Sequence, residues 1–258
     1  MGIVTSLEIL LTLIFKRMKR IALLIGNSNG LPGVKKDISN WTRFLLSDEG
    51  GQWENSEIIT KMNPARRELL SLIDTLKNTY YDFCYVIFSG HGAYKKGTIL
   101  EINGNDEIIH EDDLIGIARR QISVFDCCRN ILIEKSIDSE IIMRMYNQGG
   151  PMRRNIRPYY EKRIMSSIEQ QVRLYACSIN ESALDSENGG IYTKNLLDSS
   201  MHISGSFKVV GVAHEEAQAL TTKEAHGLQH QQTPIASLPR CFTSQQLIIS
   251  INPSGYFD

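Results

Sequence analysis

Short apolar runs alternate with segments of helical periodicity along most of this chain. Residues 21–25 and 83–88 are apolar runs of strand length, and apolar positions repeat at helical spacing within residues 38–46 and 68–76. Buried strands that alternate with amphipathic helices are typical of βαβ units. The pattern predicts an α/β fold with a mainly parallel central sheet flanked by helices.

The second of these helices has a clear start signal. Asn63 can cap it, and Pro64 suits the first helical position because its fixed φ is already helical. An apolar stripe then follows at Leu69, Leu72, Ile73 and Leu76. We therefore expect this helix to begin at Pro64 and to lead into the strand before His91.

Later segments predict a hairpin, further strands and an insertion. The remaining expected elements are a hairpin over 98–102 and 107–109, helices over 111–119, 191–197 and 213–225, and strands over 122–125, 172–177, 207–210 and 247–251. The rhythm is lost in between, where Gly149-Gly150-Pro151 precedes a basic stretch. We expect an exposed insertion at about residues 135–171.

Two of the apolar runs end in residues that carry chemistry. Residues 83–88 lead into Ser89-Gly90-His91-Gly92, and residues 122–125 lead into Asp126-Cys127-Cys128-Arg129. Because the carboxyl ends of parallel strands meet at one edge of the sheet, these motifs can bring a histidine and a thiol together. A thiolate with a nearby base is the machinery of a cysteine protease.

Each motif also has an ordinary structural explanation. His91 could be a loop histidine in a tight turn, and the two cysteines could be small buried apolar residues. Since side chains alternate along a strand, we expect one of Cys127 and Cys128 to point inward and the other to face the cleft. The charged neighbours Asp126 and Arg129 argue against a purely core position.

Size, charge and cysteine content narrow the class of protein. The 258 residues suit one domain, and 28 Lys and Arg balance 29 Asp and Glu, so nothing favours nucleic acid as a partner. Five cysteines, two of them adjacent, do not suit a disulfide framework. We therefore expect a reducing, cytoplasmic location.

Residues 1–18 form an extension before a predicted domain at 19–258. The apolar run Leu7–Phe15 is too short to span a bilayer, and its positive charges follow it, whereas a secretory signal carries them first. An amphipathic or disordered extension, with Met18 as an alternative start, is favoured over a membrane anchor. No stable membrane span is expected.

Taken together, the motifs resemble those of the caspase superfamily, especially metacaspases and bacterial orthocaspases. Besides the two motifs above, residues 21–27 resemble the family's first strand, Leu31-Pro32-Gly33 with Asp37 its first loop, and residues 175–178 with 189–193 the start of its small-subunit portion. The resemblance covers the chain from about Lys19 onward. It implies a caspase-like fold, with helices on both faces of the sheet.

The resemblance also implies roles for individual residues. His91 corresponds to the base and Cys128 to the nucleophile, and the backbone amides of Gly92 and Cys128 to the oxyanion hole. Asp37, Ser89 and Asp126 correspond to the pocket for the substrate residue before the cut, and Val34 stands where a cysteine is common. Two carboxylates there would favour Arg or Lys and repel Asp.

Two departures from the family pattern affect these expectations. The loop after the histidine reads Ala93-Tyr94-Lys95-Lys96-Gly97, without the acidic run of calcium-dependent metacaspases. We therefore expect no cofactor and no metal, and calcium dependence is doubtful. Arg129-Asn130 stands where many metacaspases have His-Ser, closer to the Cys-Arg of true caspases.

The predicted insertion lies where the family separates its large and small portions. Arg153, Arg154 and Arg157 are candidate self-processing sites if the pocket accepts basic residues. A solvated basic loop that is cut readily whatever its role explains them equally well.

Two further motifs carry less weight. Gly26-Asn27-Ser28-Asn29-Gly30 matches the nucleophile elbow of serine hydrolases, but Leu31-Pro32-Gly33 prevents the direct turn into a helix that the elbow needs. His214, His226 and His230 include an i, i+4 pair, yet the glutamine-rich surroundings favour a surface loop over a metal site.

The sequence thus predicts a cysteine endopeptidase that cleaves protein substrates after Arg or Lys. The alternative is a catalytically idle caspase-like interaction scaffold. By analogy with small bacterial proteases of antiviral cell-death systems, the expected partners are a gasdermin-like pore former as substrate and an unknown upstream activator.

Overall fold

A computed structural model describes residues 17–131 and 155–255. Its centre is a six-stranded sheet in the order β10-β8-β7-β3-β1-β2. All neighbours in this sheet pair in parallel except β10, which is antiparallel to β8. The strands are β1 (Arg20–Gly26), β2 (Ile58–Met62), β3 (Tyr81–Ser89), β7 (Ala118–Asp126), β8 (Gln170–Tyr175) and β10 (Ile235–Ser237).

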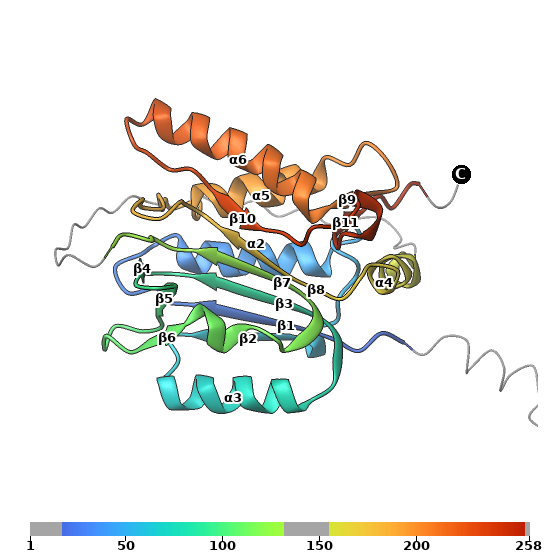
Figure 1. Ribbon diagram of the computed structural model, residues 1–258, viewed down its shortest axis with the longest axis horizontal. Helices are drawn as coiled ribbons and strands as arrows, with labels where there is room; N and C mark the ends of the chain where they lie inside the picture. The colour runs from blue at the N-terminus through green and yellow to red at the C-terminus, as the bar shows by residue number, and fades with distance from the viewer. Residues whose placement is uncertain (1–16, 132–154, 256–258) are drawn as a thin grey trace, which may run out of the picture.

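Helices cover both faces of this sheet (Figure 1). One face packs against α2 (Val34–Leu46), α4 (Arg157–Met165), α5 (Ile191–Met201) and α6 (Val210–Gly227), and the other against α3 (Arg66–Asn78). Strand β1 shows why: Ala22 and Leu24 belong to the first core, and Leu23 and Ile25 to the second. Side chains alternate along a strand, so a run buried on both faces must be apolar throughout.

Two small sheets complete the fold. An antiparallel pair joins β9 (Phe207–Val209) to β11 (Ile248–Ile251). A three-stranded sheet, β4 (Gly92–Tyr94), β5 (Thr98–Glu101) and β6 (Ile108–His110), begins directly after His91. This second sheet lies beside the carboxyl edge of the main sheet (Figure 1).

The strand register brings the ends of β1, β3 and β7 level with one another. Gly26 pairs with Ser89, and Ser89 pairs with Asp126. The segments that follow these three residues therefore leave the sheet side by side. This confirms the predicted α/β architecture with a mainly parallel sheet, and it sets where chemistry can occur.

Some predicted elements are wrong or misplaced. Residues 111–119 were expected to form one helix, but they form a 3₁₀ turn at Glu111–Leu114 and the first residues of β7. Gly116, with φ of 80°, breaks the chain between the two. Helix α3 begins at Arg66 and not at Pro64, because Asn63 has φ of 46° and its side chain bonds Ser28 instead of capping.

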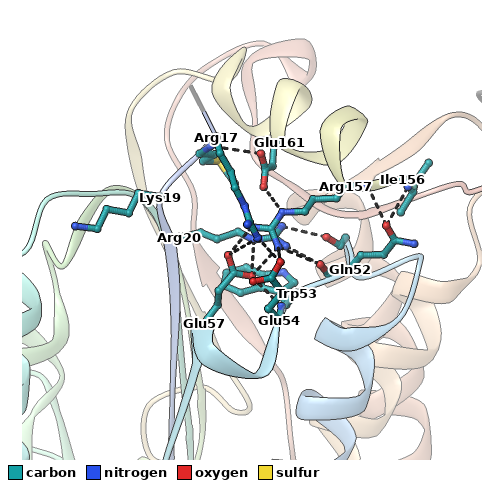
Figure 2. A network of polar contacts seen from close by, with 12 residues as sticks. Arg17, Lys19, Arg20, Gln52, Trp53, Glu54, Glu57, Ile156, Arg157 and Glu161 are labelled. Carbon is teal, nitrogen blue, oxygen red and sulfur yellow. Dashed lines mark hydrogen bonds and ion pairs between the residues drawn. The ribbon is translucent and has the colours of Figure 1, made fainter. Parts of the chain in front are cut away.

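The predicted insertion at 135–171 is shorter at its carboxyl end, since Arg157–Met165 forms α4 and Gln170 begins β8. The polar network of Figure 2 holds α4 in place. Arg157 pairs with Glu57 and, at 2.6 Å, with Glu161. Arg20 pairs with Glu57 at 3.2 Å and stacks 4.4 Å from the ring centre of Trp53.

The same network engages the end of the N-terminal extension, where Arg17 pairs with Glu54 (Figure 2). Arg17 and Arg20, two of the four positive charges that follow the apolar run, are therefore already neutralised by the folded domain. The remaining extension, residues 1–16, lies outside the described residues. Among the helices described, none is long and apolar enough to cross a membrane.

Candidate active site

The two predicted motifs meet at the carboxyl edge of the sheet. Ser89, the last residue of β3, pairs with Asp126, the last residue of β7, and the Gly90 amide donates to the Asp126 carbonyl at 3.1 Å. His91 and Cys128 follow these strand ends and line one cavity of about 40 Å³. The cavity is lined by Leu31, Val34, Asp37, Ser89, Gly90, His91, Asp126, Cys127, Cys128, Ala183, Leu184, Asp185 and Gly190.

His91 is oriented by a main-chain carbonyl from another loop. Its Nε2 lies 2.6 Å from the carbonyl oxygen of Asn29. A carbonyl only accepts, so Nε2 carries a proton and the other ring nitrogen of the neutral imidazole is left as the base. The carbonyl also stabilises the imidazolium that forms when the ring gains a second proton. No sequence pattern signals this contact, because it depends on a backbone atom of a turn.

The two adjacent cysteines occupy different environments. Cys127 is 1% exposed and belongs to the core on the α3 face, whereas Cys128 is half-buried. A Cβ atom placed on Gly92 would lie 2.6 Å from the Cys127 Sγ, so this glycine makes room for the inward thiol. The expectation that one thiol points inward is met by Cys127, and Cys128 is the thiol that solvent can reach.

Burial raises the pKa of both thiols. For Cys128 this effect is opposed by hydrogen bonding with Ala183 and Ser182, and its Sγ lies 3.8 Å from the Ala183 carbonyl. For Cys127 the pKa lies well above its ordinary value. A thiolate at Cys128 therefore needs a nearby proton acceptor, and the imidazole of His91, which lines the same cavity, can serve as one.

The predicted substrate pocket is assembled from three elements. Asp37 lies in the first turn of α2, where its carboxylate accepts from the Ser89 hydroxyl at 2.7 Å and from the Gly190 amide at 3.0 Å. Asp126 accepts from the amide and the hydroxyl of Thr193. Val34 lines the same cavity. The structure thus brings together all four predicted pocket residues.

A third carboxylate, which sequence reasoning missed, completes this wall. Asp185 accepts from the Gly33 amide at 3.0 Å through Oδ2, while its buried Oδ1 has no hydrogen-bond partner among the described residues. It belongs to the loop between β8 and α5, at no strand end and in no recognised spacing. Only its position before Gly189-Gly190 could have drawn attention to it.

The three carboxylates are costly to keep charged. Burial, reinforced by Asp126 and Asp185, raises the pKa of Asp37 well above its ordinary range. Burial raises the pKa of Asp126 to about 6 despite its bonds to Thr193, and it also raises the pKa of Asp185, although the charge of His91 favours that carboxylate. A bound cation would relieve this cost, so the cavity is electrostatically suited to a basic side chain.

The cavity is small in this structure. Its volume of about 40 Å³ compares with roughly 150 Å³ for a protein cavity that holds benzene. This volume is too small to enclose a whole Arg or Lys side chain. Ala183, Leu184 and Asp185 line the cavity from one loop.

Arg129 fixes the segment that carries Cys128. Its guanidinium is buried, lies 4.1 Å from the ring centre of Tyr175 and 5.3 Å from that of Tyr94, and donates to the Thr98 hydroxyl at 3.1 Å. Its amide donates to the carbonyl of Glu181. One side chain thereby joins the small sheet, the main sheet and the loop after β8 directly behind the nucleophile.

Of the candidate self-processing sites, Arg153 and Arg154 lie outside the described residues. Arg157 is the first residue of α4, and its guanidinium is engaged with Glu57 and Glu161 (Figure 2). Cleavage after Arg157 would require this residue to leave those ion pairs and the helix to unwind. Its role as a processing site stays a prediction.

The remaining motifs find structural roles. Ser28 bonds the side chain of Asn63 and is followed by turns, not by a helix. His214 is buried with its Nδ1 2.7 Å from the Tyr192 hydroxyl, and the Nε2 of His230 lies 2.9 Å from the Ser182 carbonyl. Across residues 17–131 and 155–255, no group of His, Cys, Asp and Glu side chains is arranged to hold a metal ion.

Comparison with known proteins places this geometry in a family. The chain matches the caspase domain of the C14 peptidases over residues 19–240. The chain belongs to the caspase-domain peptidase family. A crystal structure of the protein GSU0716 from Geobacter sulfurreducens superposes with a TM-score of 0.55 at 13% identity, covering 89% of this chain and 97% of that one. No curated protein matches the chain.

Membership of the caspase-domain family agrees with the fold derived above. The crystallographic neighbour supports the same architecture, and at its level of identity it speaks for the fold alone. The matched range includes His91, Cys128 and the three acidic residues of the cavity. The chain is therefore a caspase-like member of a protease family.

Proposed function

We propose that this chain is a cysteine endopeptidase that uses His91 and Cys128 and cleaves protein substrates after Arg or Lys. The observation that carries the proposal is the convergence of three carboxylates, Asp37, Asp126 and Asp185, on the cavity that His91 and Cys128 also line. Membership of a peptidase family supports the chemistry. The acidic wall supports the choice of substrate.

The proposed reaction proceeds through a thioester. His91 takes the proton of the Cys128 thiol, and the sulfur attacks the scissile carbonyl carbon to give a tetrahedral oxyanion. Main-chain amides of Gly92 and Cys128 would stabilise that oxyanion. As the C–N bond breaks, His91 returns the proton to the leaving amine. Water, deprotonated by His91, then hydrolyses the thioester and regenerates the thiol.

The test is turnover of a matched set of fluorogenic peptides that differ only in the residue before the cut. We expect cleavage after Arg and Lys and little after Asp or Leu, with activity abolished in Cys128→Ala and in His91→Ala but retained in Cys127→Ala. Activity that survives Cys128→Ala and is lost in Cys127→Ala would assign the nucleophile to the other cysteine.

The small volume of the cavity favours the rival function, a catalytically idle scaffold. A protease and an idle scaffold differ in the reactivity of the Cys128 thiol and in the turnover of peptides. An idle scaffold would turn over none of the four peptides, and a peptide carrying Arg and an electrophilic warhead would not label Cys128. Labelling of Cys128 without turnover would indicate a resting protease that needs an activating signal.

We further propose that the natural substrate is a protein with an exposed Arg or Lys in an extended segment, encountered in the cytoplasm. A gasdermin-like pore former is the partner suggested by analogy with small bacterial proteases. Mapping new N-termini in a lysate treated with the wild type and with Cys128→Ala would test this. Cuts that do not follow Arg or Lys would contradict the substrate class.

A further inference from the structure

The loop that follows β1 supplies the carbonyl group that contacts His91. That carbonyl belongs to Asn29, whose own side chain is exposed to solvent. An exposed loop residue has few contacts of its own that could fix its backbone. The position of the carbonyl must therefore depend on neighbours that are buried.

Asn27 is that neighbour. It directly follows β1, is 0% exposed, and accepts a hydrogen bond from the Asn29 amide at its Oδ1, 3.2 Å away. This closes a turn in which an Asn side chain replaces a backbone acceptor and so fixes the peptide groups that follow. The turn presents the Asn29 carbonyl to the imidazole.

The NH₂ group of the Asn27 side chain bonds to Glu101, the last residue of β5, which lies beside His91. Its Nδ2 donates to the main-chain carbonyl of Glu101 at 3.0 Å and to the Glu101 carboxylate at 3.3 Å. The amide of Glu101 in turn donates to the His91 carbonyl at 3.1 Å. One buried side chain therefore connects the Asn29 turn to the backbone of His91 itself.

Packing reinforces these hydrogen bonds. A Cβ atom placed on Gly90 would lie 2.9 Å from the Cβ of Asn27, so Asn27 rests against the residue before His91. The main-chain N–H of Asn27 also donates to the Ser89 carbonyl at 3.0 Å. Both backbone and side chain of Asn27 are thus committed to the segment that carries the histidine.

We propose that Asn27 is a positioning residue for His91, holding the Asn29 carbonyl where it accepts the Nε2 proton and supports the imidazolium. The proposal rests on the proposed function, in which His91 is the base. Without the fixed carbonyl the ring can rotate and the imidazolium loses a charge-assisted hydrogen bond. The thiolate of Cys128 then forms less readily.

The test compares Asn27→Asp with the wild type in the full chain. The aspartate is isosteric and keeps an acceptor for the Asn29 amide, but its second oxygen faces the acceptors of Glu101 instead of donating to them. We expect kcat/KM for an Arg peptide to fall about 10- to 100-fold through kcat, with KM unchanged. We also expect iodoacetamide to alkylate Cys128 more slowly at neutral pH, with the midpoint of its pH profile displaced upward.

Two further variants keep the test decisive. Asn27→Ser retains an oxygen that can form the turn more weakly, so it should give a smaller loss in the same direction if Asn27→Asp does not fold. Ser28→Ala changes the neighbouring residue of the same loop and should leave kinetics and alkylation at wild-type values. Circular dichroism and thermal unfolding establish that each variant is folded.

The outcomes separate this proposal from the proposed function. If His91→Ala alters the alkylation profile and Asn27→Asp and Asn27→Ser do not, the positioning role is overturned and the dyad stands. If His91→Ala leaves alkylation and turnover unchanged, the dyad itself is wrong and the role of Asn27 falls with it. A loss in the Asn27 variants confined to KM, with an unaltered pH profile, would also contradict a role acting through His91.

Discussion

The carboxylate of Asp126 accepts two hydrogen bonds from Thr193, one from the amide at 3.0 Å and one from the hydroxyl at 2.6 Å. Asp126 ends β7 and Thr193 lies in the first turn of α5, so these bonds tie the strand that carries Cys128 to the start of that helix. The bonds favour the ionised carboxylate, yet burial outweighs them and the pKa rises to about 6. Thr193 therefore fixes the position of Asp126, and the Asp126 carboxylate takes up a proton at a higher pH than an ordinary aspartate does.

This balance predicts a pH dependence of stability. Because the pKa of Asp126 is higher in the folded protein than its ordinary value of 3.8, the folded state binds more protons between about pH 4 and pH 6. The contribution of Asp126 to stability should fall as pH rises through that window, by on the order of 2–3 kcal/mol.

Asp126→Asn should remove this slope, because an amide oxygen can accept both bonds from Thr193 without titrating. The measurement is the free energy of unfolding in urea from pH 4 to pH 7 for both proteins. Burial lowers the pKa of His214 from 6.5 to about 4, which acts in the opposite direction over the same range. The informative quantity is therefore the difference between wild type and variant, and parallel curves would contradict the prediction.

We predict that replacing Asp185 raises the stability of the protein and lowers its activity. Within residues 17–131 and 155–255 its buried Oδ1 has no hydrogen-bond partner, and its charge adds to those of Asp37 and Asp126. Asp185→Asn should raise the thermal unfolding midpoint, since one of three neighbouring carboxylate charges is removed. It should also lower kcat/KM for Arg peptides about 10- to 100-fold, the value of a charge-assisted hydrogen bond.

Two comparisons guard this prediction. Activity on a Leu peptide, if measurable, should fall much less than activity on the Arg peptide, because its side chain makes no ion pair. Asn188→Ala, at an exposed residue of the same loop, should change neither property by much. Equal losses for Arg and Leu peptides would show that Asp185 shapes the loop and does not recognise charge.

The sequence was sufficient for the architecture and for the residues at strand ends. Apolar runs buried on both faces, as in β1 and β3, carry a strong signal, and parallel pairing then places Ser89 beside Asp126 without further information. The edge strand β2 was missed because half-buried positions such as Ile58 and Met62 alternate with polar ones at no distinctive period.

The parts of the site that escaped prediction depend on loops. Asp185 reaches the cavity because the loop after β8 folds back over the ends of β1 and β7, and Asn29 acts through a backbone carbonyl that any residue possesses. Neither property is encoded in residue type or spacing. The expected helix at 111–119 failed for a related reason, since Gly116 requires a positive φ and Gln121 belongs to a buried strand.

Because Arg129 is buried, we predict that replacing it lowers the free energy of unfolding, whereas replacing an exposed arginine does not. Its guanidinium is buried against Tyr175 and Tyr94, where a desolvated cation–π contact contributes about 2 kcal/mol. Arg129→Met should lower the free energy of unfolding by about 2–4 kcal/mol once the lost bond to Thr98 is included. Arg129→Lys should be intermediate, because an ammonium keeps the charge but not the planar stack.

The matched control for Arg129 lies on the surface. Arg119 stacks 5.3 Å from the ring centre of exposed Tyr80, and Arg119→Met should leave the urea midpoint unchanged. If the Arg129 and Arg119 variants behave alike, burial of the Arg129 stack is not what stabilises the segment behind Cys128.

The network around Arg157 predicts the opposite pH dependence to that of Asp126. Burial alone would raise the pKa of Glu57, but bonds from Arg157 and from the Glu54 amide outweigh it, so this pKa lies below its ordinary value of 4.5. Its contribution is present above about pH 4.5 and is lost as pH falls through the lower folded value.

Arg157→Gln should therefore destabilise the protein at pH 7 by about 1–2 kcal/mol, and the effect should shrink as the pH falls and Glu57 becomes protonated. Urea unfolding over a series of pH values from 7 downward measures this. Lys194→Gln removes the exposed, 3.9 Å pair with Glu224 and serves as the control. An effect of Arg157→Gln that does not shrink at low pH would assign it to lost packing of α4.

Gly92 predicts a loss of activity caused by displacement of the nucleophile. A Cβ atom there would lie 2.6 Å from the Cys127 Sγ and 2.8 Å from the Cys128 carbonyl oxygen, both closer than real contacts allow. Gly92→Ala should therefore push the Cys127–Cys128 segment away from His91. Since a shift of about 1 Å can cost about 100-fold in rate, we expect kcat/KM to fall by at least that factor.

The same clash predicts a partial rescue. Cys127→Ala in the Gly92→Ala background removes the Sγ but leaves the contacts with the Cβ at position 127 and with the Cys128 carbonyl. Stability should therefore recover in part, so that the double variant is more stable than the sum of the two single effects predicts, while activity stays low. Gly205→Ala is the matched control, because a Cβ there meets nothing within 4 Å and its φ is not in the left-handed region. Turnover and urea unfolding of the four variants test the argument. Strictly additive stabilities, or a fully active Gly92→Ala protein, would mean that Gly92 does not press on the residues that carry the thiol.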